Sequence, residues 1–220
     1  MVKFDSNRTY GIEIEMSWGR NERAPSQETV AAALRRAGLD CSAQRYNHTT
    51  SQGWKVVSDA SVYNGHELVS PILRGLDGKE QLKTAMAAVK AIGAMTDDSC
   101  GVHVHHGVHD FTAKQLANIA EIWKNNEQTI DKLVARSRRN TRWAATMERG
   151  ISFYENTTTE LDGEWTSEAH DANGKRELLR GLGLSSQHDR YYKVNFGCYV
   201  RQGTVEFRQH QTSLNAVRIW

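Results

Sequence analysis

The stretch TYGIEIEMSWGR, residues 9 to 20, alternates apolar and polar side chains with the two-residue period of a β-strand. One face carries the large apolar side chains, which are Tyr10, Ile12, Ile14, Met16 and Trp18. The opposite face carries Glu13 and Glu15, about 7 Å apart at the rise of a strand. The pattern predicts a strand with one buried face. Its two carboxylates form either a solvated acidic surface or part of a site.

Two further predicted strands carry coordinating side chains. In CGVHVHHGV, residues 100 to 108, the valines lie on one face, and His103 and His105 lie together on the other. A turn at residues 63–65 joins two predicted strands, WKVVSDASV (residues 54–62) and GHELVSPIL (residues 65–73). The second strand carries Glu67, which shares its face with Val69.

The C-terminal part of the chain predicts a hairpin across Arg201 and Gln202. Its strands are RYYKVNFGCYV, residues 190 to 200, and GTVEFRQH, residues 203 to 210. Glu206 and Arg208 share the polar face of the last strand. In the strand before it, the same alternation places Asn195 on one face, with Tyr191, Lys193 and Gly197, and Cys198 on the other.

The polar faces of these strands suggest a metal site. Together they carry Glu13, Glu15, Glu67, His103, His105, Glu206 and Arg208. Clustered carboxylates raise one another's pKa unless cations neutralise them. A bound divalent metal ion would neutralise this charge, so the cluster suggests a metal site. Oxygen ligands favour Mg²⁺ or Mn²⁺, and the histidines shift the preference toward Mn²⁺ or Zn²⁺.

Arg208 indicates which chemistry such a metal would serve. A guanidinium two residues from a metal-type carboxylate suits an anionic phosphate or carboxylate beside the metal. Metals and an arginine on one sheet are the components of phosphoryl transfer from a nucleotide. The alternative is a structural ion pair between Glu206 and Arg208. A second basic cluster, Arg136, Arg138, Arg139 and Arg142, is either a solvated helix end or a phosphate contact.

The remaining periodicity predicts helices and one irregular segment. Helices are expected over residues 27–37, over 79–94, from the cap at Thr112 to about residue 135, and over 175–181. Residues 147–174 are polar without periodicity and predict a loop or insertion. The C-terminal TSLNAVRIW is typical of the first turns of a helix, which predicts that the native chain continues beyond residue 220. The length of 220 residues predicts a single domain over 1–220.

Composition excludes several classes of protein. The net charge of +2 gives no electrostatic argument for a nucleic acid or membrane partner. No signal pattern or long apolar run is present, so a cytoplasmic location is expected. The three cysteines have no CxxC spacing and are expected to be reduced thiols. There is no GxxxxGK[ST], no GxGxxG after a strand and no GxSxG, so any nucleotide is held by metals and arginines.

The ordered set of motifs resembles the amidoligase family, a branch of the glutamine synthetase and glutamate–cysteine ligase superfamily. The resemblance rests on YGIEIE, WKVVSDASVYNGHELVSPIL, CGVHVH, SRRNTRW, RYYKVNF and TVEFRQH, which span nearly the whole chain. It implies an α+β fold, a curved antiparallel β-sheet of glutamine-synthetase-like catalytic type with helices packed behind it. It also implies ATP-dependent ligation of a carboxylate to an amine through an acyl phosphate, with Mg²⁺ or Mn²⁺.

The resemblance also implies roles for particular residues. The implied metal ligands are Glu13, Glu15, Glu67, His105 and Glu206. The implied contacts to the nucleotide or its phosphates are His103, His105, Asn195 and Arg208, and the implied catalytic residues are Arg208, Glu67 and Arg139. Asp59 recurs in the motif without an assigned role.

Two other hypotheses remain open from the sequence. One is a metal-dependent hydrolase that uses His103, His105 and Glu67, binds Zn²⁺ tightly and turns over without ATP. The other is a non-catalytic relative that binds a nucleotide or a partner. For a ligase, the substrates are a carboxylate and an amine carried by small molecules, peptides or proteins.

Overall fold

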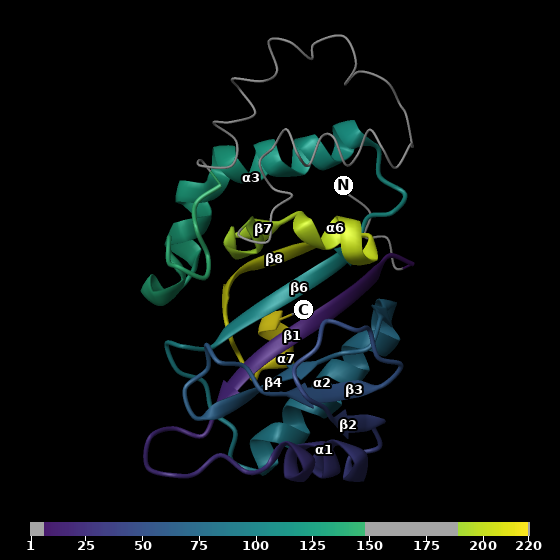
Figure 1. The fold of residues 1–220 in the computed structure, drawn as a ribbon, viewed down its shortest axis with the longest axis vertical. Coiled ribbons are helices and arrows are strands. Elements are labelled where there is room, and N and C mark those ends of the chain that lie inside the picture. Colours follow the sequence, from purple (N-terminus) through teal and green to yellow (C-terminus); the bar gives the residue numbers. More distant parts are fainter. Residues whose placement is uncertain (1–6, 148–188, 220) are drawn as a thin grey trace. The chain divides into compact units, whose positions relative to one another are not determined.

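The computed structural model describes residues 7–147 and 189–219 (Figure 1). The chain divides into two compact units. Unit 1 comprises the chain up to Val104 together with the segment from His210 onward, and unit 2 comprises His105–Gln209. Each unit has its own hydrophobic core. The single domain over residues 1–220 stays a prediction. The expected loop over 147–174, apart from Met147, and the expected helix over 175–181 lie outside the described residues.

The strands of unit 1 form a mostly antiparallel open sheet in the order β2-β3-β4-β1-β6, with β5 pairing β1 at its start. Pairs β1/β4 and β3/β4 are antiparallel, and β2/β3 is parallel. The strands are β1 (Thr9–Ser17), β2 (Cys41–Ala43), β3 (Trp54–Val57), β4 (Gly65–Val69), β5 (Leu73–Arg74) and the first four residues of β6 (Gly101–Gly107).

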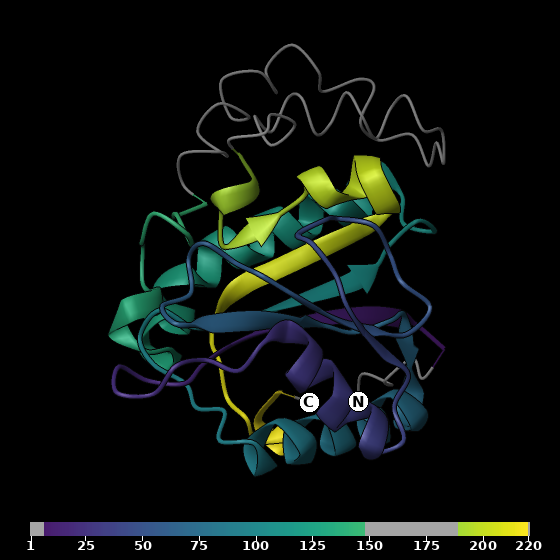
Figure 2. The same cartoon turned by 60° about the horizontal axis from the view of Figure 1, so that its bottom comes forward.

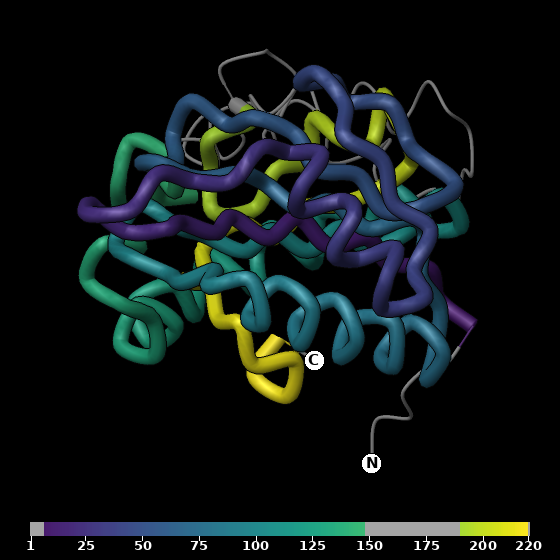
Figure 3. Tube along the Cα trace, turned by 90° about the horizontal axis from the view of Figure 1, so that it is seen from below, coloured from purple at the N-terminus to yellow at the C-terminus, as the bar shows by residue number. Residues whose placement is uncertain are grey.

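Two helices cover one face of this sheet, α1 (Gln27–Arg36) and α2 (Gly75–Ala91). Figure 2 shows them side by side, and Figure 3 shows α2 running alongside the strands. The apolar face predicted for β1 is buried against them in one core with Leu34 and Leu82. The short helix α7 (Ala216–Ile219) packs on α2. The alternation of residues 9–18 therefore does predict which face of β1 is covered, and Glu13 and Glu15 lie on the other face.

Three sequence-based boundaries in unit 1 need correction. The strand predicted to reach residue 62 ends at Val57, and the helix predicted from residue 79 begins at Gly75. The strand predicted over 65–73 is interrupted after Val69, because Pro71 has no N–H to give to a strand ladder. The turn that leads into β4 needs glycine at position 65, because a Cβ there would lie 2.0 Å from the carbonyl oxygen of Met16.

Unit 2 consists of a long helix and a small sheet in the order β6-β8-β7 (Figure 1). Helix α3 (Ala113–Leu133) is capped at its N-terminus by Thr112, as expected. The Thr112 hydroxyl accepts from the Gln115 N–H, and the Gln115 side chain accepts from the Thr112 N–H. The other elements are β7 (Val194–Asn195), α6 (Gly197–Gln202), β8 (Thr204–Gln211, which continues into unit 1) and two 3₁₀ turns at Arg136–Arg138 and Asp189–Tyr191.

The strand predicted over residues 190–200 is wrong in this unit. Only Val194 and Asn195 pair with β8, and the chain then turns into helix α6 rather than into a two-residue hairpin. The Asn195 side chain starts this turn by accepting a hydrogen bond from the Gly197 N–H at 2.9 Å. Gly203 ends the helix in the left-handed conformation at φ 67°.

None of the helices within residues 7–147 and 189–219 has both the length and the apolar character needed to cross a bilayer.

Candidate functional site

The polar face of unit 1 brings two buried glutamates directly opposite each other. Glu15 of β1 and Glu67 of β4 are register partners in the antiparallel pair, and their exposed fractions are 3% and 5%. Directly opposite side chains on one face lie about 4.5–5.5 Å apart at Cβ, so the carboxylates repel each other. Burial adds a desolvation cost to each charge, which favours a bound cation between them.

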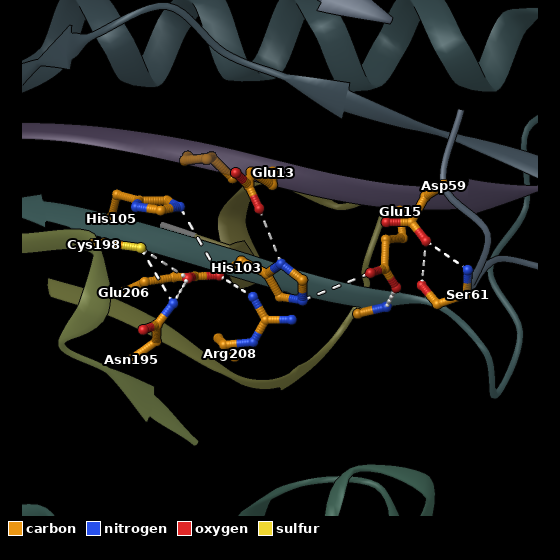
Figure 4. A network of polar contacts seen from close by, with 12 residues as sticks. Glu13, Glu15, Asp59, Ser61, His103, His105, Asn195, Cys198, Glu206 and Arg208 are labelled. Carbon is orange, nitrogen blue, oxygen red and sulfur yellow. Dashed lines mark hydrogen bonds and ion pairs between the residues drawn. The ribbon is translucent and has the colours of Figure 1, made fainter. Parts of the chain in front are cut away.

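His103 of β6 lies between two carboxylates of the same face (Figure 4). Its Nδ1 is 3.1 Å from Glu13 Oε2, and its Nε2 is 3.6 Å from Glu15 Oε1. Glu15 also accepts a hydrogen bond from the backbone N–H of Gly101, the first residue of β6. The backbone of β6 and the imidazole on it therefore fix the orientation of Glu15.

Glu15, Glu67 and His103 have the donor set of a divalent metal site. One ligand atom of each lies within 4.8 Å of the others, and all three side chains are buried. Two carboxylates with one imidazole suit Mg²⁺ or Mn²⁺, and the imidazole weights the set toward Mn²⁺. The group fits the metal that the sequence suggests. The structure brings together the predicted residues Glu13, Glu15, Glu67 and His103 within unit 1.

Lys55 is a buried cation of this face that the sequence analysis did not identify. It lies on β3, which pairs with β4, and its exposed fraction is 2%. Its ammonium donates to the Asn47 carbonyl, to the Asn47 side chain and to the Thr49 carbonyl at 2.8–3.1 Å. Burial lowers the pKa of Lys55, and the charges of Glu13 and Glu67 partly oppose that shift. A lysine inside the apolar run WKVV is the signal that could have identified it.

Asp59, which recurs in the family motif, has a local structural role here. Its side chain accepts hydrogen bonds from the N–H and the hydroxyl of Ser61, as Figure 4 shows. This is an Asx turn, which shapes the chain between β3 and β4.

The polar site of unit 2 is centred on Glu206 of β8 (Figure 4). One carboxylate oxygen accepts from Arg208 and lies 3.9 Å from His105 Nε2. The other accepts from Asn195 at 2.7 Å and from the Cys198 thiol at 3.3 Å. The exposed fraction of Glu206 is 2%. The structure therefore gathers the predicted residues His105, Asn195, Glu206 and Arg208 around one buried carboxylate.

Cys198 belongs to this group although the sequence placed it on the face opposite Asn195. Helix α6 reverses the expected alternation, and the Asn195 amide donates to Cys198 Sγ at 3.2 Å. Burial raises the pKa of the Cys198 thiol. An Asn followed two residues later by Gly is a turn signal, and applying it here would have ended the strand at residue 195.

The amide of Asn195 is engaged within the protein. Its two N–H groups reach Glu206 and Cys198, and its oxygen accepts from Gly197. These bonds make Asn195 a residue that positions Glu206. Its expected contact with a nucleotide or phosphate stays a prediction.

Of the four arginines after α3, only Arg138 is buried, and Arg136, Arg139 and Arg142 are exposed. Arg139, one of the three predicted catalytic residues, donates from its Nε to the Val134 carbonyl at 3.1 Å. Arg138 is buried and donates to the carbonyl of Arg208 at 2.8 Å. The backbone N–H of Arg208 in turn donates to the Lys193 carbonyl at 2.9 Å. The catalytic role of Arg139 stays a prediction, and Arg138 is the residue that fixes the backbone of Arg208.

A buried ion cluster joins α3 to the small sheet of unit 2. Lys193 has an exposed fraction of 0%, and its ammonium lies 2.6 Å from Glu127 and 2.7 Å from Asp131. Gln209 also donates to Asp131, and the backbone N–H of Met147 donates to Glu127. Two neighbours of Arg208 are therefore anchored to α3. They are Gln209, the next residue in the chain, and Lys193, whose carbonyl accepts from the Arg208 N–H.

The chain matches the family described as "Putative amidoligase enzyme" over residues 6–220. The chain therefore belongs to the amidoligase family, as its motifs indicate, and this membership supports a ligase activity. The curated proteins contain no match to the chain.

Proposed function

We propose that this protein is an ATP-dependent carboxylate–amine ligase that uses Mg²⁺ or Mn²⁺ and forms an amide through an acyl phosphate. The observation that carries the proposal is the buried pair Glu15 and Glu67 with His103, found in a member of the amidoligase family. The proposal includes a sheet of glutamine-synthetase-like catalytic type. Its substrates are a carboxylate and an amine on small molecules or peptides.

Each cluster has a separate part in this proposal. Glu15, Glu67 and His103 would hold a divalent ion, and Glu13 would orient His103. A bound divalent ion neutralises charge on the phosphates of ATP during transfer of the γ-phosphoryl group. In unit 2, the ion pair with Glu206 and the backbone contacts from Arg138 and Lys193 hold the Arg208 guanidinium. A guanidinium held in this way suits the charge of a phosphoryl group, with His105 as a further phosphate contact.

The reaction divides into two displacements. The substrate carboxylate oxygen attacks the γ-phosphorus of ATP, the bond to the bridging oxygen breaks and ADP leaves. The neutral amine then attacks the acyl carbon, phosphate leaves and one proton passes from the nitrogen to a base. The first displacement is needed because a free carboxylate has a poor leaving group.

The test incubates the full chain with MgATP and pools of amino acids and short peptides. We expect ADP and a new amide in equal amounts, and no ADP with Glu67→Gln. Glu22→Gln, at an exposed position of the same unit, is the matched control and should keep the activity.

Three outcomes would overturn the proposal. A folded, metal-bound protein that does not bind MgATP would do so. Zinc-dependent turnover without ATP would support a hydrolase instead. ATP binding without ADP formation in any substrate pool would support a non-catalytic relative.

A further inference from the structure

The connection between β2 and β3 covers part of the polar face of unit 1. The two strands are parallel, so residues 44–53 carry the chain from the end of β2 back to the start of β3. On one face of the sheet, Trp54 and Val56 of β3 share a core with α1 and α2. Lys55 lies between them and extends to the other face, where its ammonium bonds to the connection. The connection therefore lies on the face that carries the glutamates of the site.

The Lys55 ammonium anchors this connection. It donates to the carbonyls of Asn47 and Thr49 and to the side-chain oxygen of Asn47, at 2.8–3.1 Å. These bonds use all three N–H donors of a lysine. The Asn47 oxygen also accepts from the Thr49 N–H. Its amide donates to the Gln44 side chain and to the Arg45 carbonyl. Residues 44–49 are therefore folded around the contact between Lys55 and Asn47.

The anchored segment lies beside the metal group of unit 1. Lys55, Val69 and Glu13 are register partners across β3, β4 and β1, so their backbones lie within two strand spacings, about 10 Å. Glu67 lies on the same face of β4, two residues before Val69. Burial lowers the pKa of Lys55, and the charges of Glu13 and Glu67 raise it in part, so both carboxylates act on the ammonium.

The buried anchor supports an exposed surface. Arg45, Tyr46 and His48 of the segment are exposed. The rings of Tyr46 and His48 are in edge contact with their centroids 5.1 Å apart. An apolar side chain would fill the place of Lys55 without the cost of burying a charge, but it would not make three directed bonds. The lysine therefore contributes a fixed conformation of residues 44–49.

We propose that Lys55 is a positioning residue that fixes residues 44–49 as a wall of the candidate site, and that this wall contacts the amino-acid or peptide substrate. The substrate part rests on the ligase function proposed above. That function assigns residues to the metal ion and to the phosphates, and it assigns none to the organic substrates. A guanidinium and two aromatic side chains on a fixed backbone suit a ligand that carries carboxylate and amide groups.

The anchor is tested by hydrogen exchange on the full chain. Lys55→Met should make the backbone amides of residues 44–50 exchange at least about 10-fold faster. Asn47→Ala removes the other side of the same contact at a partly exposed position, and it should have the same effect without a change in the sheet. Lys90→Met, at an exposed position of α2, is the control and should change nothing there. Unchanged exchange of residues 44–50 in folded Asn47→Ala would overturn the proposal.

The substrate role is tested by kinetics with the pools of amino acids and short peptides. In Lys55→Met and Asn47→Ala, the half-saturating concentration of the pool should rise about 10-fold, with kcat within about 2-fold of the wild-type value. The double variant should be no worse than the weaker single variant, because both remove one contact. The KM for MgATP should not change, and Mn²⁺ should bind at least as tightly, since no metal ligand is lost.

The outcomes separate this inference from the proposed function. A rise in the KM for MgATP alone, or a loss of kcat without a change in the half-saturating concentration, would overturn the substrate role. So would amide formation with wild-type kinetics in Asn47→Ala. A wild-type chain that forms no amide from any pool would overturn the ligase function and the substrate role together. The exchange experiment decides the anchoring role of Lys55 in either case.

Discussion

The two polar clusters of this protein neutralise buried carboxylates in different ways. In unit 1, Glu15 and Glu67 lie opposite each other across β1 and β4, so the sheet register itself creates the repulsion. In unit 2, the single carboxylate of Glu206 is paired with Arg208 and hydrogen-bonded by Asn195 and Cys198. The first arrangement favours a hard divalent cation. The second is largely balanced by the protein's own hydrogen-bond donors.

The ion cluster of Lys193 gives the largest expected effect on stability. Lys193→Met would leave the buried Glu127 and the partly buried Asp131 without their shared cation, which should destabilise the fold by about 3 kcal/mol. Chemical denaturation of the variant measures this loss.

Two controls sharpen this prediction about Lys193. Lys132→Met removes an exposed charge from α3, the helix that carries Glu127 and Asp131, and should change stability by less than about 0.5 kcal/mol. Combining Lys193→Met with Glu127→Gln and Asp131→Asn should recover much of the loss. Equal stability of Lys193→Met and Lys132→Met would contradict the view that unit 2 depends on fully paired buried charge.

Glu67→Gln should change metal affinity and stability in opposite directions. Losing a carboxylate ligand should weaken Mn²⁺ binding by about 100-fold, equal to about 2.7 kcal/mol. Removing one of two like charges from the register pair should stabilise the metal-free protein by up to about 1 kcal/mol. Calorimetric titration with Mn²⁺ and denaturation with chelator measure the two effects. A Glu67→Gln variant that is less stable without metal and binds Mn²⁺ normally would contradict the view that Glu15 and Glu67 repel each other and hold a divalent cation.

The helix caps provide a smaller and more local comparison of the units. Thr112→Ala removes the capping box of α3, and Ser26→Ala removes the cap that accepts from Thr29 on α1. Each should cost about 1 kcal/mol, with the larger loss for Thr112 because its box has two reciprocal bonds. Hydrogen exchange should show faster opening of α3 in the first variant and of α1 in the second. Equal acceleration of both helices in either variant would show that the units do not open separately.

The last expected effect is on thiol reactivity near neutral pH rather than on stability. Burial raises the pKa of Cys41 to about 12 and of Cys100 to about 11, so about one in 10,000 and one in 1,000 of these groups would be thiolate at pH 8. A disulfide reagent should therefore react with the native chain at least about 100-fold more slowly than with free cysteine.

The buried thiols also make the free energy of unfolding depend on pH, and the direction of this dependence follows from their pKa values. The folded pKa values lie above the ordinary value of 9.0, so the folded state favours the neutral thiol. Its contribution to stability is constant below pH 9 and declines as the pH rises toward 11 and 12. The absorbance of the group that the disulfide reagent releases, recorded from pH 7 to 9, measures how fast the buried thiols react. Rapid labelling of Cys41 at pH 7 would contradict the buried environment of unit 1.

Local sequence pattern predicted much of the fold and part of each cluster. The alternation in residues 9–18 identified the covered face of β1, and Thr112 identified the start of α3, because both signals depend on neighbours within a few residues. The strand predicted over residues 190–200 failed because the side chain of Asn195 redirects the backbone into α6. Cys198 was missed for the same reason, and Lys55 was missed because its partners in the segment 47–49 are not periodic.

The sequence by itself determined the amidoligase family, the two-residue spacing of Glu13 and Glu15, and the shared face of Glu206 and Arg208. These follow from strand periodicity and from the order of short motifs. Only the tertiary structure decided that Glu67 lies opposite Glu15, that Arg138 rather than Arg139 is buried against Arg208, and that Cys198 reaches Glu206. The reason is that register, burial and the meeting of separate elements depend on contacts between residues far apart in the chain, which local periodicity does not encode.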